Sequence, residues 1–388
     1  MEYLHGCKNL KLDLKNKKSI AILIIILIAS ILAVLKITDI IQANKYGYFK
    51  RLPDMNVARA GHKTFLLSDG RVLIIGGDKN NTAEIYNPND NTCTMCKDLS
   101  KILHKKSHII LITDEELFIQ GSVSKITQSL LYNLKTSEIK ELPRMRFNRL
   151  YNYIIPLPNK KILIIGGYDK DSNNKNKALM TAEIYDPISN KFYETSKANY
   201  PHLNKGSELK SIVLQNNNVL LLDGNRSELF DFKKNKFMKI DDNISGKVVY
   251  TGIDKFLTVS YKDKKTERKS TVVLNLYKID NLKIKKIQSF ESVKYRKYNL
   301  MSSSFVSYNN KILITGGIRG TSGICSWSGS EAFIYNIDQN KLIKINNMKI
   351  SRLLHNCINT KDRKIIISGG IGNGSPFETR LVEVFVYN

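Results

Sequence analysis

The stretch ARAGHKTFLLSDGRVLIIGGDKNNTAEIYNP, residues 58–88, holds two apolar runs, a Gly-Gly pair and a Tyr within one short span. Its first apolar run, residues 63–67, is followed by the turn signal Asp69-Gly70 and by a second run that ends at Gly76-Gly77. Two apolar runs joined by Asp-Gly predict a β-hairpin. A third strand is predicted at residues 83–86, and the polar segment after it turns the chain into a fourth.

The same frame returns twice more along the chain. MNVARAGHKTFLLSDGRVLIIGG at 55–77 aligns without gaps with MRFNRLYNYIIPLPNKKILIIGG at 145–167 and with MKISRLLHNCINTKDRKIIISGG at 348–370. In each copy an Arg follows the Met by four residues, and the Gly-Gly pair begins seventeen residues after that Arg. Such self-similarity is the signature of a repeat architecture.

Weaker copies fill the intervals between these three. Glycine-anchored strands, or their relics, end near residues 76, 121, 166, 223, 260, 316 and 369, which gives seven units of four short strands each. Repeats of this kind predict an all-β fold, a seven-bladed β-propeller, with six blades as the alternative count. Because glycine adopts positive φ and leaves room for another backbone, the glycine pairs suit tight packing beside the propeller axis.

The pattern RAGH…LLSDGRVLIIGG…AEIYNP resembles the kelch repeat, in the form found in bacterial kelch and galactose-oxidase-like propellers. The resemblance extends over residues 46–388 and is weaker in units two, four and five. The Trp that is usual in the fourth strand of such a unit is missing. The residues in its place are Cys93, Phe192, Phe237 and Leu342.

The two ends of the repeat region predict how the ring closes. LVEVFVYN at 381–388 is a third strand with no fourth behind it, whereas GYFKRLPDM at 47–55 is similar to a fourth strand with nothing before it. We therefore expect the N-terminal strand to complete the last blade, which removes two open sheet edges.

A long apolar run precedes the repeats. Residues 19–35, SIAILIIILIASILAVL, contain no charge and no helix breaker, and further isoleucines extend the run to residue 41. This length predicts one transmembrane helix, and the lysines that cluster before it place the N-terminus in the cytoplasm. A cleaved signal peptide is the alternative. The predicted plan is a basic cytoplasmic segment at 1–18, a transmembrane signal anchor at 19–41, a linker at 42–46 and a propeller at 47–388, displayed outside the cytoplasm in an extracellular or periplasmic location.

The chain is strongly basic. Its formal net charge is +26, and the densest block, residues 255–297, holds thirteen Lys or Arg against four acids. Such a charge favours an anionic partner. The other interpretation is a Lys-rich composition that only solvates strand faces.

No metal site and no cofactor are predicted. Cys93 and Cys96 form a C-x-x-C motif without a second pair to hold zinc. The D-x-D-x-N segment that begins at Asp169 lacks the Gly and the Glu of a calcium loop.

Candidate ligand-binding residues lie where the units meet the channel axis. In a propeller the first strand of each unit lines the central channel, so the repeated Arg that precedes this strand is expected at the channel mouth. The resemblance implies that Arg at this position binds acidic ligands; the alternative is that it fixes blade geometry. Loops after the glycines open on the same face. The candidates are Arg59, His104, Arg149 and Arg352 at the mouth, with Tyr168, Arg319 and Trp327 in the loops.

Together these features predict a single-pass membrane protein whose kelch-type propeller binds an acidic glycan or protein; nucleic acid is not the expected partner. No H-E-x-x-H, G-x-S-x-G or P-loop pattern occurs, and the two His and two Tyr of a copper site cannot be matched. Two alternatives stay open: a carbohydrate-active enzyme of the galactose-oxidase or sialic-acid-epimerase type, and a cytoplasm-facing adaptor. The ligand and the oligomeric state are not predicted.

Overall fold

The computed structural model of the protein describes most of the propeller region. The described residues are 21, 24–34, 37, 45–103, 107–123, 126–170, 175–203, 210–214, 216–223, 226–240, 244, 246–252, 254–264, 269–280, 283–294, 302–322, 325–360, 362–372 and 377–388. The chain divides into a large unit, Phe49–Val386, and a small unit made of Met1–Tyr48 with Tyr387–Asn388.

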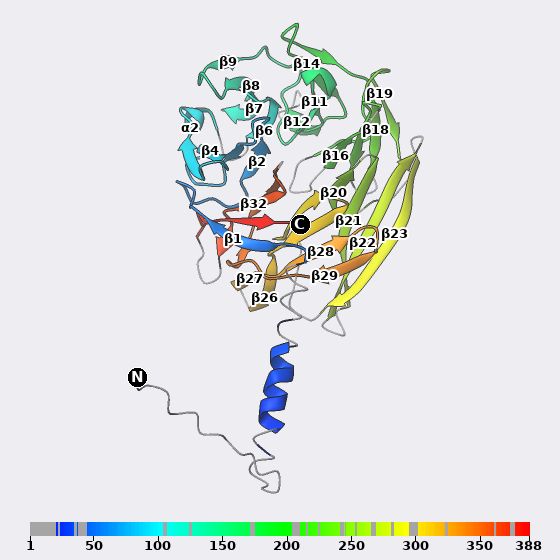
Figure 1. Ribbon diagram of the computed structural model, residues 1–388. Coiled ribbons are helices and arrows are strands. Elements are labelled where there is room, and N and C mark those ends of the chain that lie inside the picture. Colours follow the sequence, from blue (N-terminus) through cyan, green and yellow to red (C-terminus); the bar gives the residue numbers. More distant parts are fainter. Residues whose placement is uncertain are drawn as a thin grey trace. The chain divides into compact units, whose positions relative to one another are not determined.

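The large unit contains seven antiparallel four-stranded sheets (Figure 1). The predicted seven-bladed β-propeller is therefore confirmed. Blades one to three are β2 (Lys63–Leu66), β3 (Val72–Ile75), β4 (Ala83–Asn87), β5 (Thr92–Met95); β6 (His108–Thr113), β7 (Glu116–Val123), β8 (Ile126–Asn133), β9 (Ile139–Glu141); and β10 (Tyr153–Pro156), β11 (Ile162–Ile165), β14 (Ala182–Asp186), β15 (Lys191–Glu194).

Blades four to six follow in the same order along the chain. They are β16 (Lys210–Val213), β17 (Val219–Leu222), β18 (Glu228–Asp231), β19 (Lys236–Lys239); β20 (Lys247–Gly252), β21 (Lys255–Lys264), β22 (Lys269–Asp280), β23 (Lys283–Lys294); and β24 (Ser304–Tyr308), β25 (Lys311–Thr315), β28 (Ala332–Asn336), β29 (Lys341–Lys344). Two-stranded hairpins are inserted in blades three and six: β12 (Tyr168–Lys170) with β13 (Asn176–Ala178), and β26 (Ile318–Ser322) with β27 (Cys325–Ser328).

Blade seven joins the two ends of the repeat region. Its strand order is β1 (Tyr48–Leu52), β34 (Val382–Val386), β32 (Lys364–Ser368) and β31 (Asn356–Asn359), so the first strand of the ring is the outermost strand of the last blade. The rings of Phe49 and Phe385 pack with centroids 4.8 Å apart across this pairing. The expected closure by the N-terminal strand is confirmed.

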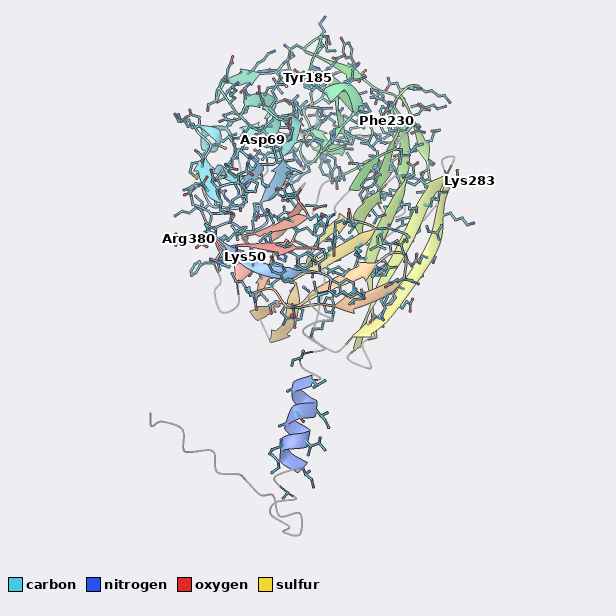
Figure 2. All side chains as sticks on the ribbon, in the orientation of Figure 1. Lys50, Asp69, Tyr185, Phe230, Lys283 and Arg380 are labelled. Carbon is cyan, nitrogen blue, oxygen red and sulfur yellow. The ribbon has the colours of Figure 1, made fainter. Side chains whose placement is uncertain are left out.

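The core lies between blades rather than within one sheet. The second strand of a blade is apolar and buried along its whole length, as in β3, β11 and β17, because neighbouring blades cover both of its faces. Each hydrophobic cluster accordingly combines residues of two adjacent blades, for example one with two and three with four. Tyr185 and Phe230, labelled in Figure 2, each pack on the fourth-strand aromatic of their own blade, Phe192 and Phe237.

The small unit contains part of the predicted membrane segment. Residues 24–34 are helical and exposed, whereas residues 1–18 and several positions of 19–41 lie outside the described residues. Within the part of the chain that the structure describes, no helix combines the length and the apolar character needed to cross a bilayer.

Candidate functional site

The repeated Arg binds carboxylate and carbonyl groups of its own blade. In blade three, Nε and Nη2 of Arg149 donate to Glu183 Oε1 at 3.1 and 2.9 Å. Nη1 donates to the carbonyl oxygens of Gly166 and Thr181 at 3.0 and 2.8 Å, and Nη2 also donates to Thr181 Oγ1. Arg59 makes the corresponding contacts in blade one, with Glu84, Gly76 and Thr82.

The backbone at the same position contacts the preceding blade. The second glycine of one blade donates its N–H to the carbonyl oxygen at the Arg position of the next: Gly370 to Arg59 at 2.7 Å and Gly317 to Arg352 at 3.1 Å. The first glycine leaves room for that carbonyl, since a Cβ on Gly369 would lie 2.4 Å from the Arg59 oxygen. The Arg position and the glycine pair thus form one inter-blade junction, which confirms the predicted close backbone approach.

Blade four has a histidine at the Arg position. His202 follows Asn199 by three residues, as Arg59 follows Asn56, and its carbonyl oxygen accepts the N–H of Gly167 at 2.9 Å. Nδ1 of His202 lies 3.1 Å from Asp223 Oδ2, and Nε2 lies 3.0 Å from Glu228 Oε1. Burial acts to lower the pKa of this imidazole, but the hydrogen bonds and charges of the two carboxylates outweigh it and raise the pKa above 6.5.

This histidine predicts a loss of stability at alkaline pH. Because its pKa is raised on folding, its contribution is complete below pH 6.5 and is lost as pH rises through the folded-state pKa. We expect His202→Arg, which keeps a permanent charge between the same carboxylates, to abolish this loss. Urea unfolding of both proteins at about pH 6 and about pH 9 measures it. An equal alkaline decline in the two proteins would contradict the assignment.

In blade seven, the guanidinium of the repeated Arg has fewer hydrogen-bond partners. Arg352 Nη1 donates to the carbonyl oxygens of Gly369 and Leu381 at 3.0 Å each, but Nη2 lies 3.5 Å from Glu383 Oε1. Leu381 stands where blades one and three have Thr, so the hydroxyl acceptor for Nη2 is missing. Nε and Nη2 of Arg352 and Oε1 of Glu383 are buried without a hydrogen-bond partner.

The predicted ligand-binding residues differ in their surroundings in the structure. The side chains of Arg59, Arg149 and Arg352 are 0 % exposed and bonded within their blades, which favours the architectural interpretation of these residues. Tyr168 begins β12, where its backbone pairs with that of Leu150, beside Arg149. His104 and the side chains of Arg319 and Trp327 lie outside the described residues.

A second set of residues, one from each blade, lies at the glycine end of the innermost strands. Each pairs with the second-strand residue immediately before the glycine position, as Lys63 pairs with Ile75 and Asn356 with Ser368. Sequence reasoning did not identify this set, because its residue types differ between blades. We call it the inner-strand ring: Lys63, His108, Tyr153, Lys210, Lys247, Ser304 and Asn356.

Members of the inner-strand ring reach toward the next blade. Lys63 Nζ donates to the Ile109 carbonyl at 3.2 Å, and Lys247 Nζ to the Ser303 carbonyl at 2.8 Å. The innermost strands β2, β6 and β31 line a cavity of about 370 Å³ that includes Lys63. Burial and the charge of Lys63 lower the pKa of His108 to about 4, so this imidazole is neutral at physiological pH.

The inner-strand ring has a one-sided charge. No Asp or Glu occurs among the residues assigned to the seven innermost strands, whereas Lys occurs at the ring position of blades one, four and five. Positive charges that line a channel with low-dielectric walls attract anions. The glycine end of the channel is therefore suited to an acidic group.

Two further histidines lie beside the junctions. His62 Nε2 is 2.8 Å from Ser368 Oγ, and His355 Nε2 is 2.9 Å from Thr315 Oγ1, each on the preceding blade. Burial and nearby Arg charges lower both pKa values, that of His62 to about 3. These contacts give both residues a structural role between blades.

The sequence matches no protein-family model and no curated protein. Among solved structures, one described as a "novel fungal alcohol oxidase with catalytic diversity among the AA5 family, in complex with copper" is similar, with a TM-score of 0.60 and 16 % identity over 89 % of this chain and 76 % of that one. At this identity the similarity shows the propeller fold alone.

In the described part of this chain, no group of three or more His, Cys, Asp or Glu side chains is arranged to hold a metal ion. His62 and His355 already use Nε2 in hydrogen bonds, and the charges of Arg59 and Arg352 oppose a further cation beside them.

Proposed function

We propose that this chain is a kelch-type propeller that serves as a binding module for an acidic ligand, a glycan or a protein. The ligand docks at the glycine end of the channel, on the inner-strand ring. One observation carries the proposal: the seven innermost strands contain no acid, and Lys63 and Lys247 stand in equivalent positions at that end. A carboxylate or sulfate there gains charge-assisted hydrogen bonds from ammonium groups.

Residues 19–41 are proposed as a membrane anchor, with the N-terminus in the cytoplasm and the propeller outside it. The proposal rests on the uncharged apolar run and on the lysines before it. Protease treatment of intact cells tests the orientation. Cleavage of the propeller is expected, and a propeller that is cut only after lysis would overturn it.

The binding experiment uses the full chain and a panel of uronic-acid oligosaccharides and acidic peptides beside their neutral counterparts. We expect Lys63→Gln with Lys247→Gln to weaken acidic-ligand binding about tenfold or more, because a hydrogen bond to a charged group contributes about 1.5–3 kcal/mol. Lys135→Gln with Lys344→Gln is the matched control, since it removes the same charge from exposed positions elsewhere.

His108 reports binding independently of affinity. An anion beside Lys63 offsets the charge that helps to lower the pKa of His108, so saturation with ligand is expected to raise this pKa above about 4 in an NMR titration. The ring variant and the control could instead lose the same affinity, with all binding abolished by salt. That result would mean that the ligand is attracted only by the overall surface charge and not by a specific site.

A further inference from the structure

A cavity of about 710 Å³ opens on blade three, within the usual size range of small-molecule sites. Its walls come from three segments: the turn before Arg149, the inserted hairpin β12–β13 with the residues that follow it, and the end of β15. None of its lining residues belongs to an innermost strand. The cavity is therefore separate from the inner-strand ring.

Apolar side chains form one part of the lining. The larger apolar residues that line it are Phe147, Leu179 and Met180. Leu179 is buried, whereas Met180 is 39 % exposed. The Phe147 ring also lies close to two guanidinium groups, with Arg146 Cζ 5.6 Å and Arg149 Cζ 5.5 Å from its centroid. An apolar group that covers these side chains removes hydrophobic surface from water.

Charged side chains form the other part, in which the basic Arg146, Lys177 and Lys197 lie beside the acidic Asp169 and Glu194. Lys177 and Lys197 are exposed and pair with no acidic side chain within the described ranges. Arg146 Nη1 lies 2.6 Å from Glu194 Oε2, but the two side chains are 68 % and 40 % exposed. Because an exposed ion pair of this kind contributes little, an incoming anion can compete for the guanidinium.

The turn that carries Arg146 and Phe147 is held by buried groups. The backbone N–H of Arg146 donates to Glu183 Oε2 at 2.8 Å, and the other oxygen of Glu183 accepts the Arg149 guanidinium. The aromatic ring and the guanidinium are thus presented from backbone that the core of the blade fixes. Such preorganisation lowers the cost of ordering the site when a ligand binds.

We propose that this cavity binds a small amphiphilic anion, a molecule with an apolar body and one carboxylate or sulfonate. The apolar body covers Phe147, Leu179 and Met180, and the anionic group contacts Lys177, Lys197 or Arg146. This site does not depend on the acidic ligand proposed for the inner-strand ring.

The test uses 4-(trifluoromethyl)benzenesulfonate as the probe and the full chain in nanodiscs of zwitterionic lipid, with empty nanodiscs subtracted. Binding is measured from the fluorine NMR line of the probe. We expect saturable binding of the sulfonate and at least tenfold weaker binding of the neutral 4-(trifluoromethyl)benzyl alcohol. Lys177→Gln with Lys197→Gln is expected to weaken sulfonate binding about tenfold, and Met180→Asp to weaken it further.

Two control variants make the outcome decisive. Lys135→Gln with Lys344→Gln should leave sulfonate binding unchanged, and Lys63→Gln with Lys247→Gln shows whether the inner-strand ring takes up any of the probe. Loss of binding only in the Lys63 and Lys247 variant would place the probe at the inner-strand ring and overturn this inference, while it would support the proposed function. Equal affinity in all variants, or equal affinity for the neutral alcohol, would also overturn it.

Discussion

Gly166→Ala adds a single methyl group and is expected to destabilise the propeller by about 3–5 kcal/mol. A Cβ at this position would lie 2.0 Å from the carbonyl oxygen of His202, and the glycine has a φ of +71°. The oxygen cannot withdraw without cost, because it accepts the N–H of Gly167 in the junction between blades three and four. Denaturant unfolding measures the loss.

Gly70→Ala separates steric overlap from backbone strain. Gly70 has a φ of +87°, but a Cβ there would meet nothing within 4 Å. Its replacement should therefore cost only the strain of a left-handed alanine, about 1–2 kcal/mol. If both variants lost the same stability, the close approach of the His202 carbonyl would not be the cause.

Arg149→Met is expected to cost about 3–5 kcal/mol, because it leaves Glu183 buried without its cation. Glu183 is 2 % exposed, and the guanidinium that it loses makes five hydrogen bonds within the blade. Denaturant unfolding at about pH 7 measures the loss.

Arg352→Met is the matched control in blade seven. Arg352 is equally buried, yet its Nε and Nη2 have no hydrogen-bond partner and its Nη2 is 3.5 Å from Glu383. The wild-type interaction is weaker, so its removal should cost clearly less than the removal of Arg149. A larger loss in blade seven would contradict the view that the hydrogen bonds of Arg149 carry the energy of the junction.

The sequence predicted the number of blades and the closure of the ring because the repeated residues have local causes. Gly166 and Gly369 mark strand ends where only glycine allows the next backbone to approach, and the same requirement holds at Gly316. The unmatched strands at the two ends of the region were equally visible. Such features depend on spacing along the chain and need no knowledge of distant contacts.

The roles of the arginines could not be read in the same way. Arg149 and its partner Glu183 are separated by 34 residues, and only the folded structure shows that they meet. The inner-strand ring was missed because equivalent positions carry Lys63, Tyr153 and Asn356, which share no chemistry. His202 was missed because blade four lacks both the Arg and the Gly-Gly pair by which blades one, three and seven were aligned.

The pairing of β1 with β34 also sets an order of events during biosynthesis. The ribosome releases β1 first, whereas its partner β34 is made after the strands of all the other blades. Six blades can assemble from consecutive hairpins while β1 is still unpaired. The seventh blade requires a loop closure across nearly the whole propeller. During that interval both β1 and the unfinished ring expose unpaired strand edges, the period when a nascent chain is most prone to exchange strands with its neighbours.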